Sequence, residues 1–175
     1  MNTDSSLGPL DVLVVLKLLA QPAMNWTYKE LGKHVGVSAS QAFLSVNRAA
    51  RSGLLHLPAL RDSLNRTNIK EFLIHGLKYS FPVYRGALTR GIPTAYAAPP
   101  LNHVLTQSSE PPPVWPYAQG SVRGVELSPL YKTAPRAAQQ DPKLYELLAL
   151  IDAIRDGRAR EREIAIRELS ARIDL

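Results

Sequence analysis

The chain has no cysteine, which excludes a disulfide framework, a thiolate metal site and a thiol nucleophile. A reducing, cytoplasmic setting is compatible with that absence. Long apolar runs are also missing near the N-terminus, because the longest, 12–20, is interrupted by Lys17 and is far shorter than the ~20 residues of a membrane span. No basic region precedes it as in an export signal. We expect a soluble cytoplasmic protein with no membrane partner.

Groups of residues that signal catalysis or metal binding are equally scarce. The histidines form no close ligand pair with one another, no glycine-rich phosphate loop follows a strand, and no Ser-His-Asp arrangement is recognisable. Three arginines beside glycines or turns could form an anion or ligand pocket, or could add contacts to phosphate, although solvated loop arginines are the favoured interpretation: Arg85, Arg90 and Arg123. We therefore expect no enzyme, no cofactor and no metal.

What the chain does have is an apolar content of 45% over 175 residues, enough for one or two small domains with a core. Its net charge of +6 is uneven. Residues 1–90 carry eleven Lys and Arg against five Asp and Glu, residues 91–140 carry three against two, and residues 141–175 carry seven against eight. Excess positive charge in the first part indicates attraction to phosphate, with simple solubility as the alternative.

The segment 26–55, WTYKELGKHVGVSASQAFLSVNRAARSGLL, has the pattern of a helix-turn-helix. A helix is predicted over 28–35, a glycine follows it, and a second helix is predicted over 39–52. Ser38 and Gln41 form an S-x-x-Q capping box that marks the start of the second helix. Two helices joined by a short glycine-containing turn are the unit that many proteins place in the DNA major groove. The sequence therefore predicts DNA binding.

The second helix of this pair should present a polar face to DNA. Counting from Ser38 places an inward stripe at Ala42, Val46, Ala49 and Gly53. The outward positions are Gln41, Leu44, Ser45, Asn47, Arg48 and Arg51. We expect Gln41 and Arg48 to read bases, because Gln pairs with adenine edges and Arg with guanine. The whole predicted DNA-contacting set is Lys29, Lys33, Ser38, Ser40, Gln41, Asn47, Arg48, Arg51 and Arg66.

Two large apolar residues, Phe43 and Leu44, interrupt that polar face. They could touch thymine methyl groups, or they could pack against Leu54 or the first helix. Packing is the favoured interpretation, since large apolar side chains are usually buried.

The flanking segments predict further helices. Residues 7–20 should form a first core helix, residues 54–57 a short strand, and residues 68–78 a further helix, so that any wing is confined to 54–66. Ten of the fourteen prolines lie between Pro93 and Pro142, and we expect an irregular, partly packed extension over 81–140 with 107–113 as its most mobile part.

Two C-terminal helices are predicted after that extension. Asp141 can cap the first, whose apolar stripe runs from Leu144 to Ile154, and Gly157 separates it from the second, over 158–173. These helices could cover the core or join a second copy of the chain.

The run 16–55 resembles bacterial winged helix-turn-helix transcriptional regulators of the multiple-antibiotic-resistance type, through WTYKELGKHVGVSASQA followed by NRAARSGLL. The remainder is similar to C-terminal regions of small regulators beside toxin or phage-defence genes. This resemblance implies an operon regulator or an antitoxin-like role. In such regulators, polar or basic groups are common where Phe43 and Leu44 stand.

Together these features predict a mainly α-helical protein: a winged helix-turn-helix domain over 1–80, the proline- and aromatic-rich extension over 81–140, and helices over 141–175 that could serve dimerisation. The expected function is sequence-specific binding of double-stranded DNA as a homodimer that represses transcription of its own operon. The alternative is a protein–protein interaction module, an antitoxin or a subunit of a defence complex, whose helix-turn-helix surface binds a toxin or defence protein.

Overall fold

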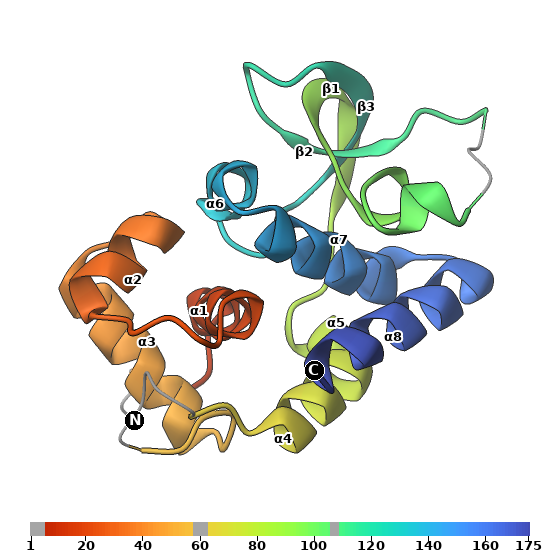
Figure 1. Cartoon of the computed structure of the whole chain (residues 1–175). Helices are drawn as coiled ribbons and strands as arrows, with labels where there is room; N and C mark the ends of the chain where they lie inside the picture. The colour runs from red at the N-terminus through yellow and green to blue at the C-terminus, as the bar shows by residue number, and fades with distance from the viewer. Residues whose placement is uncertain (1–5, 58–62, 106–108) are drawn as a thin grey trace.

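The computed structural model describes residues 6–57, 63–105 and 109–175, and it is mainly helical with one three-stranded mixed sheet (Figure 1). The α-helices are α1 (Pro9–Ala20), α2 (Tyr28–Val35), α3 (Ala39–Arg51), α4 (Arg66–Glu71), α5 (Leu77–Ser80), α6 (Ala134–Gln140), α7 (Pro142–Asp156) and α8 (Ala159–Ile173). A π-helical turn (Phe72–Gly76) joins α4 to α5. The strands are β1 (Arg85–Pro93), β2 (Pro113–Pro116) and β3 (Val122–Leu127). Within the described ranges, no helix is long and apolar enough to cross a membrane.

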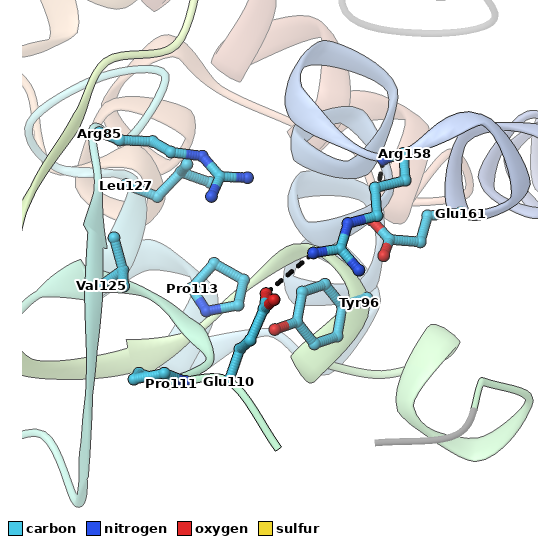
Figure 2. A pocket seen from close by; sticks show the side chains of 9 residues that line it. All are labelled: Arg85, Tyr96, Glu110, Pro111, Pro113, Val125, Leu127, Arg158 and Glu161. Atoms are coloured by element: carbon cyan, nitrogen blue, oxygen red, sulfur yellow. Dashed lines mark hydrogen bonds and ion pairs between the residues drawn. The ribbon is translucent and has the colours of Figure 1, made fainter. Parts of the chain in front are cut away.

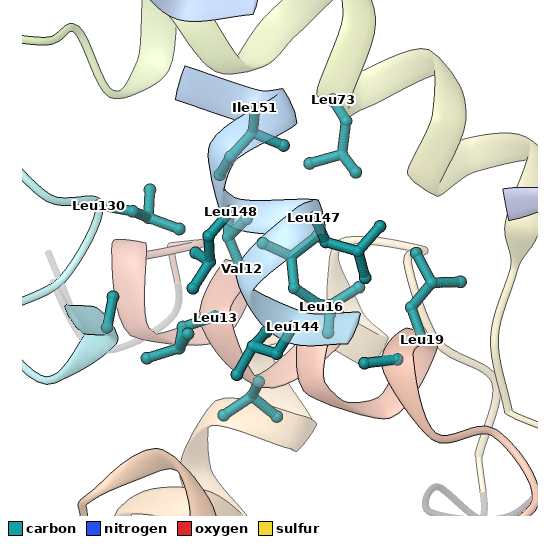
Figure 3. Close-up of a cluster of buried hydrophobic side chains, with 14 of the residues drawn as sticks. Val12, Leu13, Leu16, Leu19, Leu73, Leu130, Leu144, Leu147, Leu148 and Ile151 are labelled. Carbon is teal, nitrogen blue, oxygen red and sulfur yellow. The ribbon is translucent and has the colours of Figure 1, made fainter. Parts of the chain in front are cut away.

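Helix α1 is the centre of the molecule. Every residue from position 10 to position 20 is buried, as expected for a helix that is apolar around nearly its whole circumference. It contacts α2 and α3 on one side and α7 on the other. Leu13 and Leu16 of α1 lie beside Leu144 and Leu147 of α7 in a close-packed layer (Figure 3).

The C-terminal helices follow the predicted pattern. Asp141 caps α7, whose apolar stripe is buried, and Gly157 separates α7 from α8. Helix α8 inserts Ala165, Leu169 and Ile173, all 0% exposed, into the same hydrophobic cluster. The apolar faces of both helices are therefore covered within one chain.

The prediction of an irregular extension over 81–140 is wrong, because this region contains the sheet and helix α6. Strand β1 pairs antiparallel with β2 and with β3, and β2 pairs parallel with β3. The prolines are tolerated because Pro93 ends β1 while Pro113 and Pro116 bound β2, positions where the missing N–H does little harm to the ladder. The predicted mobile stretch 107–113 lies partly outside the described residues, and its last residue opens β2.

The hydrophobic cluster includes side chains from all three predicted segments, among them Leu16, Trp115 and Leu148. The division into domains stays a prediction, but the segments share this core. Over the predicted wing, Leu55 forms an isolated antiparallel bridge with Leu64, and residues 58–62 between them lie outside the described part of the chain.

Candidate nucleic-acid interface

Two capping boxes determine where α2 and α3 begin. The Thr27 hydroxyl accepts a hydrogen bond from the Glu30 N–H (3.2 Å), and the Glu30 carboxylate accepts one from the Thr27 N–H (3.1 Å). Hydrogen bonds from the Thr27 hydroxyl and N–H lower the pKa of Glu30. At α3, Ser38 and Gln41 exchange the equivalent bonds, both 3.1 Å, which confirms the predicted capping box.

The geometry of the helix pair requires glycine at two positions, one in the turn and one in α2. Gly36 has φ +78°, the left-handed region that glycine adopts without a steric penalty, and its N–H bonds the Gly32 carbonyl. A Cβ on Gly32 in α2 would lie 2.7 Å from the Val37 carbonyl oxygen, so a side chain there would displace the backbone of the turn. From outside the pair, the Thr133 hydroxyl donates to the Val35 carbonyl (2.6 Å) and connects the end of α2 to the start of α6.

The inner face of α3 agrees with the prediction at three positions, since Ala42, Val46 and Ala49 are all 0% exposed. Ser45 was expected on the outward face, but it is fully buried. Its hydroxyl accepts a hydrogen bond from the Arg48 guanidinium (3.3 Å), which satisfies this buried polar group.

Arg48, predicted to read a base, instead binds a buried carboxylate of α1. Its Nε and Nη2 donate to the two oxygens of Asp11, at 2.9 and 2.8 Å, and this bidentate geometry is the strongest that an Arg–carboxylate pair adopts. The Asp11 side chain is 0% exposed and the Arg48 side chain 18%. The carboxylate also accepts from the Gly8 N–H (2.7 Å), and so it caps α1 as well. The side chain of Arg48 is committed to joining α3 to α1.

Arg66, predicted to supply electrostatic affinity for DNA, opens α4 near the end of α3, where the Asn68 side chain donates to the Gly53 carbonyl (2.8 Å), but its own side chain contacts α8. Its guanidinium donates to the Ile173 carbonyl at the end of α8. It lines a pocket with Lys143, Glu146 and Arg172, near the C-terminus. The Arg66 guanidinium is therefore committed to the α4–α8 contact.

The remaining predicted contacts share the outer surface of α2 and α3. Among the described residues the structure records no partner for the exposed side chains of Lys29, Lys33, Ser40 and Arg51. Ser38 and Gln41 are exposed at the start of α3 and bonded to each other, while half-buried Asn47 donates from Nδ2 to the Phe43 carbonyl (2.8 Å).

Phe43 and Leu44 do not pack in the core, so the favoured packing interpretation is wrong. Their exposed fractions are 48% and 46%, although the Phe43 ring contacts the edge of Tyr28 at a centroid distance of 5.2 Å. Both side chains lie on the first half of α3, with roughly half of each open to solvent.

Behind the helix pair, a buried ion pair connects α1 to α7. Lys17 Nζ donates to Asp141 Oδ2 (2.6 Å), and the two side chains are 1% and 4% exposed. Burial disfavours the charged carboxylate, but the hydrogen bonds from Lys17 and from the Leu144 N–H outweigh it and lower the pKa of Asp141. Lys17 also lies 5.4 Å from the centroid of the Trp26 ring.

On α2, His34 packs against this same cluster. Its ring meets the edge of the Trp26 ring at a centroid distance of 5.2 Å. Burial, and then the charge of Lys17, lowers the pKa of His34. The His34 ring is therefore part of the contact between α2 and the core.

Sequence patterns missed Asp11 and Lys17 as structural groups. One sequence feature could have identified them: Asp11 and Lys17 are the only two charged residues in α1, which is otherwise apolar. A charge buried in such a helix requires a partner.

A second site, shown in Figure 2, is a pocket beside the sheet that includes Arg85, Tyr96, Arg158 and Glu161. The basic groups of this pocket are neutralised: Arg85 pairs with Asp156 (2.7 Å) and Arg158 with Glu110 (2.9 Å).

The other two arginines of the predicted anion pocket lie elsewhere. Arg90 and Arg123 face each other across β1 and β3 and do not line the pocket that contains Arg85. The structure does not bring the three arginines into one site, and it places them on strands rather than loops. Within residues 6–57, 63–105 and 109–175, no cluster of His, Asp or Glu could hold a metal ion.

Comparison with protein-family models, curated proteins and solved structures finds no match to this chain.

Proposed function

We propose that this protein is a DNA-binding transcriptional regulator that places α3 in the major groove of a specific duplex. The observation that carries the proposal is the α2–turn–α3 unit itself. Both helices are capped, the inner face of α3 is buried against α1, and the outer surface bears cations without partners among the described residues. This is the arrangement that helix-turn-helix proteins use to reach base edges.

The charge on this unit favours nucleic acid. From Tyr28 to Arg51 the two helices carry four Lys and Arg and one carboxylate, Glu30, which is held in the α2 cap. With Arg48 neutralised by Asp11, the electrostatic affinity for phosphate comes from Lys29, Lys33 and Arg51. Ser38, Ser40, Gln41 and Asn47 complete the proposed contact surface.

The winged variant of the fold is part of the same proposal. The Leu55–Leu64 bridge is flanked by bonds from the His56 N–H to the Ser63 carbonyl (2.6 Å) and from the Asn65 N–H to the Leu54 carbonyl (3.0 Å). Antiparallel pairing directly after α3 is what the base of a small wing requires.

We further propose that the protein binds as a homodimer and represses its own operon, since two copies would read two half-sites about one helical turn apart. The apolar faces of α7 and α8 are covered within the chain. The dimer contact therefore has to use another surface.

The test is selection of bound duplexes from a random library with the purified full chain, followed by fluorescence anisotropy across a salt series. We expect a preferred sequence over its scrambled version and a steep salt dependence. Equal binding of the two duplexes would leave only a sequence-blind basic surface, and no binding at low salt would refute the proposal.

Matched charge variants locate the contact. Lys33→Gln with Arg51→Gln should flatten the slope of log K against log salt by about 2 per bound protomer, at about 0.9 per phosphate contact. Arg160→Gln with Arg167→Gln removes the same charge from the exposed side of α8 and should leave the slope unchanged. Equal effects of the two pairs would contradict α2 and α3 as the interface.

A second candidate function is favoured by one observation, the exposure of Phe43 and Leu44. An apolar pair on α3 suits a protein partner such as a toxin or defence protein. Association that is insensitive to salt, together with a partner that co-purifies, would support this candidate over DNA binding.

A further inference from the structure

The polar side chains of α3 that could read base edges are already oriented by bonds within the chain. Gln41 Oε1 accepts from the Ser38 N–H, Asn47 Nδ2 donates to the Phe43 carbonyl, and Arg48 binds Asp11 through two nitrogens. Bidentate recognition of adenine needs both the oxygen and the nitrogen of an amide, and bidentate recognition of guanine needs a free guanidinium edge. Each of these three side chains would have to give up or share an existing bond.

Helix geometry places an apolar side chain where these groups would otherwise act. Residues 40, 44, 47 and 51 follow the i, i+4, i+7, i+11 spacing and share one face of α3. Leu44 is therefore in line with Ser40, Asn47 and Arg51, with 46% of its side chain exposed. The first turns of a recognition helix are the part that contacts base edges.

Phe43 adjoins this face and is held in position. Its ring meets Tyr28 of α2 nearly perpendicularly, with an interplanar angle of 85°, so one edge is fixed by the partner helix and 48% of the side chain stays open. An oriented aromatic ring loses little conformational freedom when a ligand covers it.

The surrounding charge identifies what would cover this apolar pair. Lys29 and Lys33 on α2 and Arg51 at the end of α3 are exposed cations with no partner in the part of the chain that the structure describes. Their counterpart is a surface with an apolar centre between rows of negative charge. The major groove has this character where thymine places its C5-methyl group between the two phosphate backbones.

We propose that Phe43 and Leu44 recognise thymine by packing against C5-methyl groups in the major groove, so that the preferred duplex carries thymine opposite the first half of α3. This inference rests on the proposed DNA-binding function. Specificity then comes from methyl contacts, while Lys33 and Arg51 supply phosphate contacts that are independent of sequence.

Deoxyuridine gives a direct test, because it removes only the methyl group and keeps the hydrogen-bonding edge of thymine. The selected duplex is compared by anisotropy with duplexes in which each thymine in turn is replaced by deoxyuridine. At one or two positions we expect about fourfold weaker binding, the ratio that corresponds to ~0.8 kcal/mol for one buried methyl group.

Protein variants connect that loss to the two side chains. Leu44→Ala and Phe43→Ala should each weaken binding to the thymine duplex and reduce the thymine-to-deoxyuridine ratio towards one at their own position. Leu88→Ala is the matched control, because Leu88 is a similarly exposed leucine (52%) on β1, and it should leave the ratio unchanged.

The outcomes separate this inference from the function on which it rests. A selected duplex that is bound over its scrambled version, with no position sensitive to deoxyuridine, overturns the thymine contact and leaves DNA binding intact. Binding of no duplex overturns both. Loss of a co-purified protein by the Phe43 and Leu44 variants, with unchanged DNA affinity, overturns the thymine contact in favour of a protein-binding surface.

Discussion

Replacement of Arg48 by alanine is the sharpest test of how α3 is held. The Asp11 carboxylate is 0% exposed and accepts two hydrogen bonds from Arg48 and one from the Gly8 N–H. In the Arg48→Ala variant, Oδ1 of Asp11 loses its donor while the carboxylate stays in an apolar helix. The structure therefore predicts a large loss of stability from a residue that a sequence pattern assigns to base reading.

The magnitude follows from burial. Breaking a buried ion pair by removing one partner costs ~3–5 kcal/mol, because the other charge is left uncompensated. Arg48 is 18% exposed, so water can reach the space that it vacates and hydrate Asp11 in part. We expect a loss of about 3 kcal/mol, the lower end of that range. A cycle with Asp11→Asn should give a coupling energy of about 2 kcal/mol.

Urea unfolding at pH 7 measures this loss, with Arg51→Ala as the matched control. Arg51 lies one turn further along α3, is exposed, and has no recorded partner among the described residues, so its removal should cost less than about 0.5 kcal/mol. DNA affinity, measured where both variants are folded, should fall for Arg51→Ala and stay near wild type for Arg48→Ala. Equal stabilities of the two variants would refute the structural role of Arg48.

Three other perturbations test the supports behind α3. Gly36→Ala puts a Cβ at φ +78° and 3.1 Å from the Thr133 Cβ, so urea unfolding should show a loss of about 1–2 kcal/mol. Asp141→Asn leaves buried Lys17 without its anion and should cost about 3 kcal/mol at pH 7. Because the pKa of Asp141 is lowered in the folded chain, the unfolded chain binds the proton more readily, and the free energy of unfolding falls below about pH 4. Asp141→Asn removes this titrating group and should make that fall shallower. Burial also lowers the pKa of His34 in the folded chain, so protonation below about pH 6.5 favours the unfolded chain. His34→Gln should therefore make the loss of stability below that pH shallower.

Each of these three has an outcome that would contradict it, and two have a control variant. An unchanged unfolding midpoint for Gly36→Ala would contradict the need for glycine in the turn. Asp174→Asn breaks an exposed pair with Lys70 and should cost under about 1 kcal/mol, so an equal cost for Asp141→Asn would refute the buried pair. His56, at an exposed position, is the control for His34, and identical pH profiles of wild type and His34→Gln would disprove its contribution.

The parts of the fold that sequence predicted are those with local signals. The Ser38–Gln41 capping box lies within one helical turn, and the stripe of Ala42, Val46 and Ala49 follows a period that any buried helix face shows. Asp141 before a proline marked the start of α7 for the same reason. These features depend on residues three or four apart, so the chain alone determines them.

The sheet and the roles of the arginines depend on distant residues. Strand β1 pairs with β3 across two intervening 3₁₀ turns (Ala95–Ala97 and Leu101–His103) and β2, and a count of prolines does not reveal that pairing. Arg48 reaches a carboxylate 37 positions away, and Lys17 reaches one 124 positions away. Helical periodicity predicts which side of a helix a side chain faces, but it does not predict which distant residue lies on that side. Assigning faces to a helix from the sequence therefore cannot identify either carboxylate.

The long-range bonds have one consequence for recognition. The Arg48–Asp11 pair joins α3 to α1, the Lys17–Asp141 pair joins α1 to α7, and the Thr133 hydroxyl holds the end of α2. The backbone of α3 is thus supported from behind by polar and charged groups that are buried or partly buried. Side chains on a supported helix keep their geometry without help from the ligand.

Stability and DNA affinity should therefore be separable in this protein. Substitutions at the buried polar links lower the free energy of unfolding and reduce affinity only as far as they reduce the folded population. Substitutions at the exposed Lys33, Leu44 or Arg51 leave the unfolding transition in place and change affinity directly, because these residues are exposed and lie outside the hydrophobic cluster of the described residues. A set of variants that fell on one line of affinity against stability would contradict this division, since it would mean that the outer surface of α3 acts only through the fold.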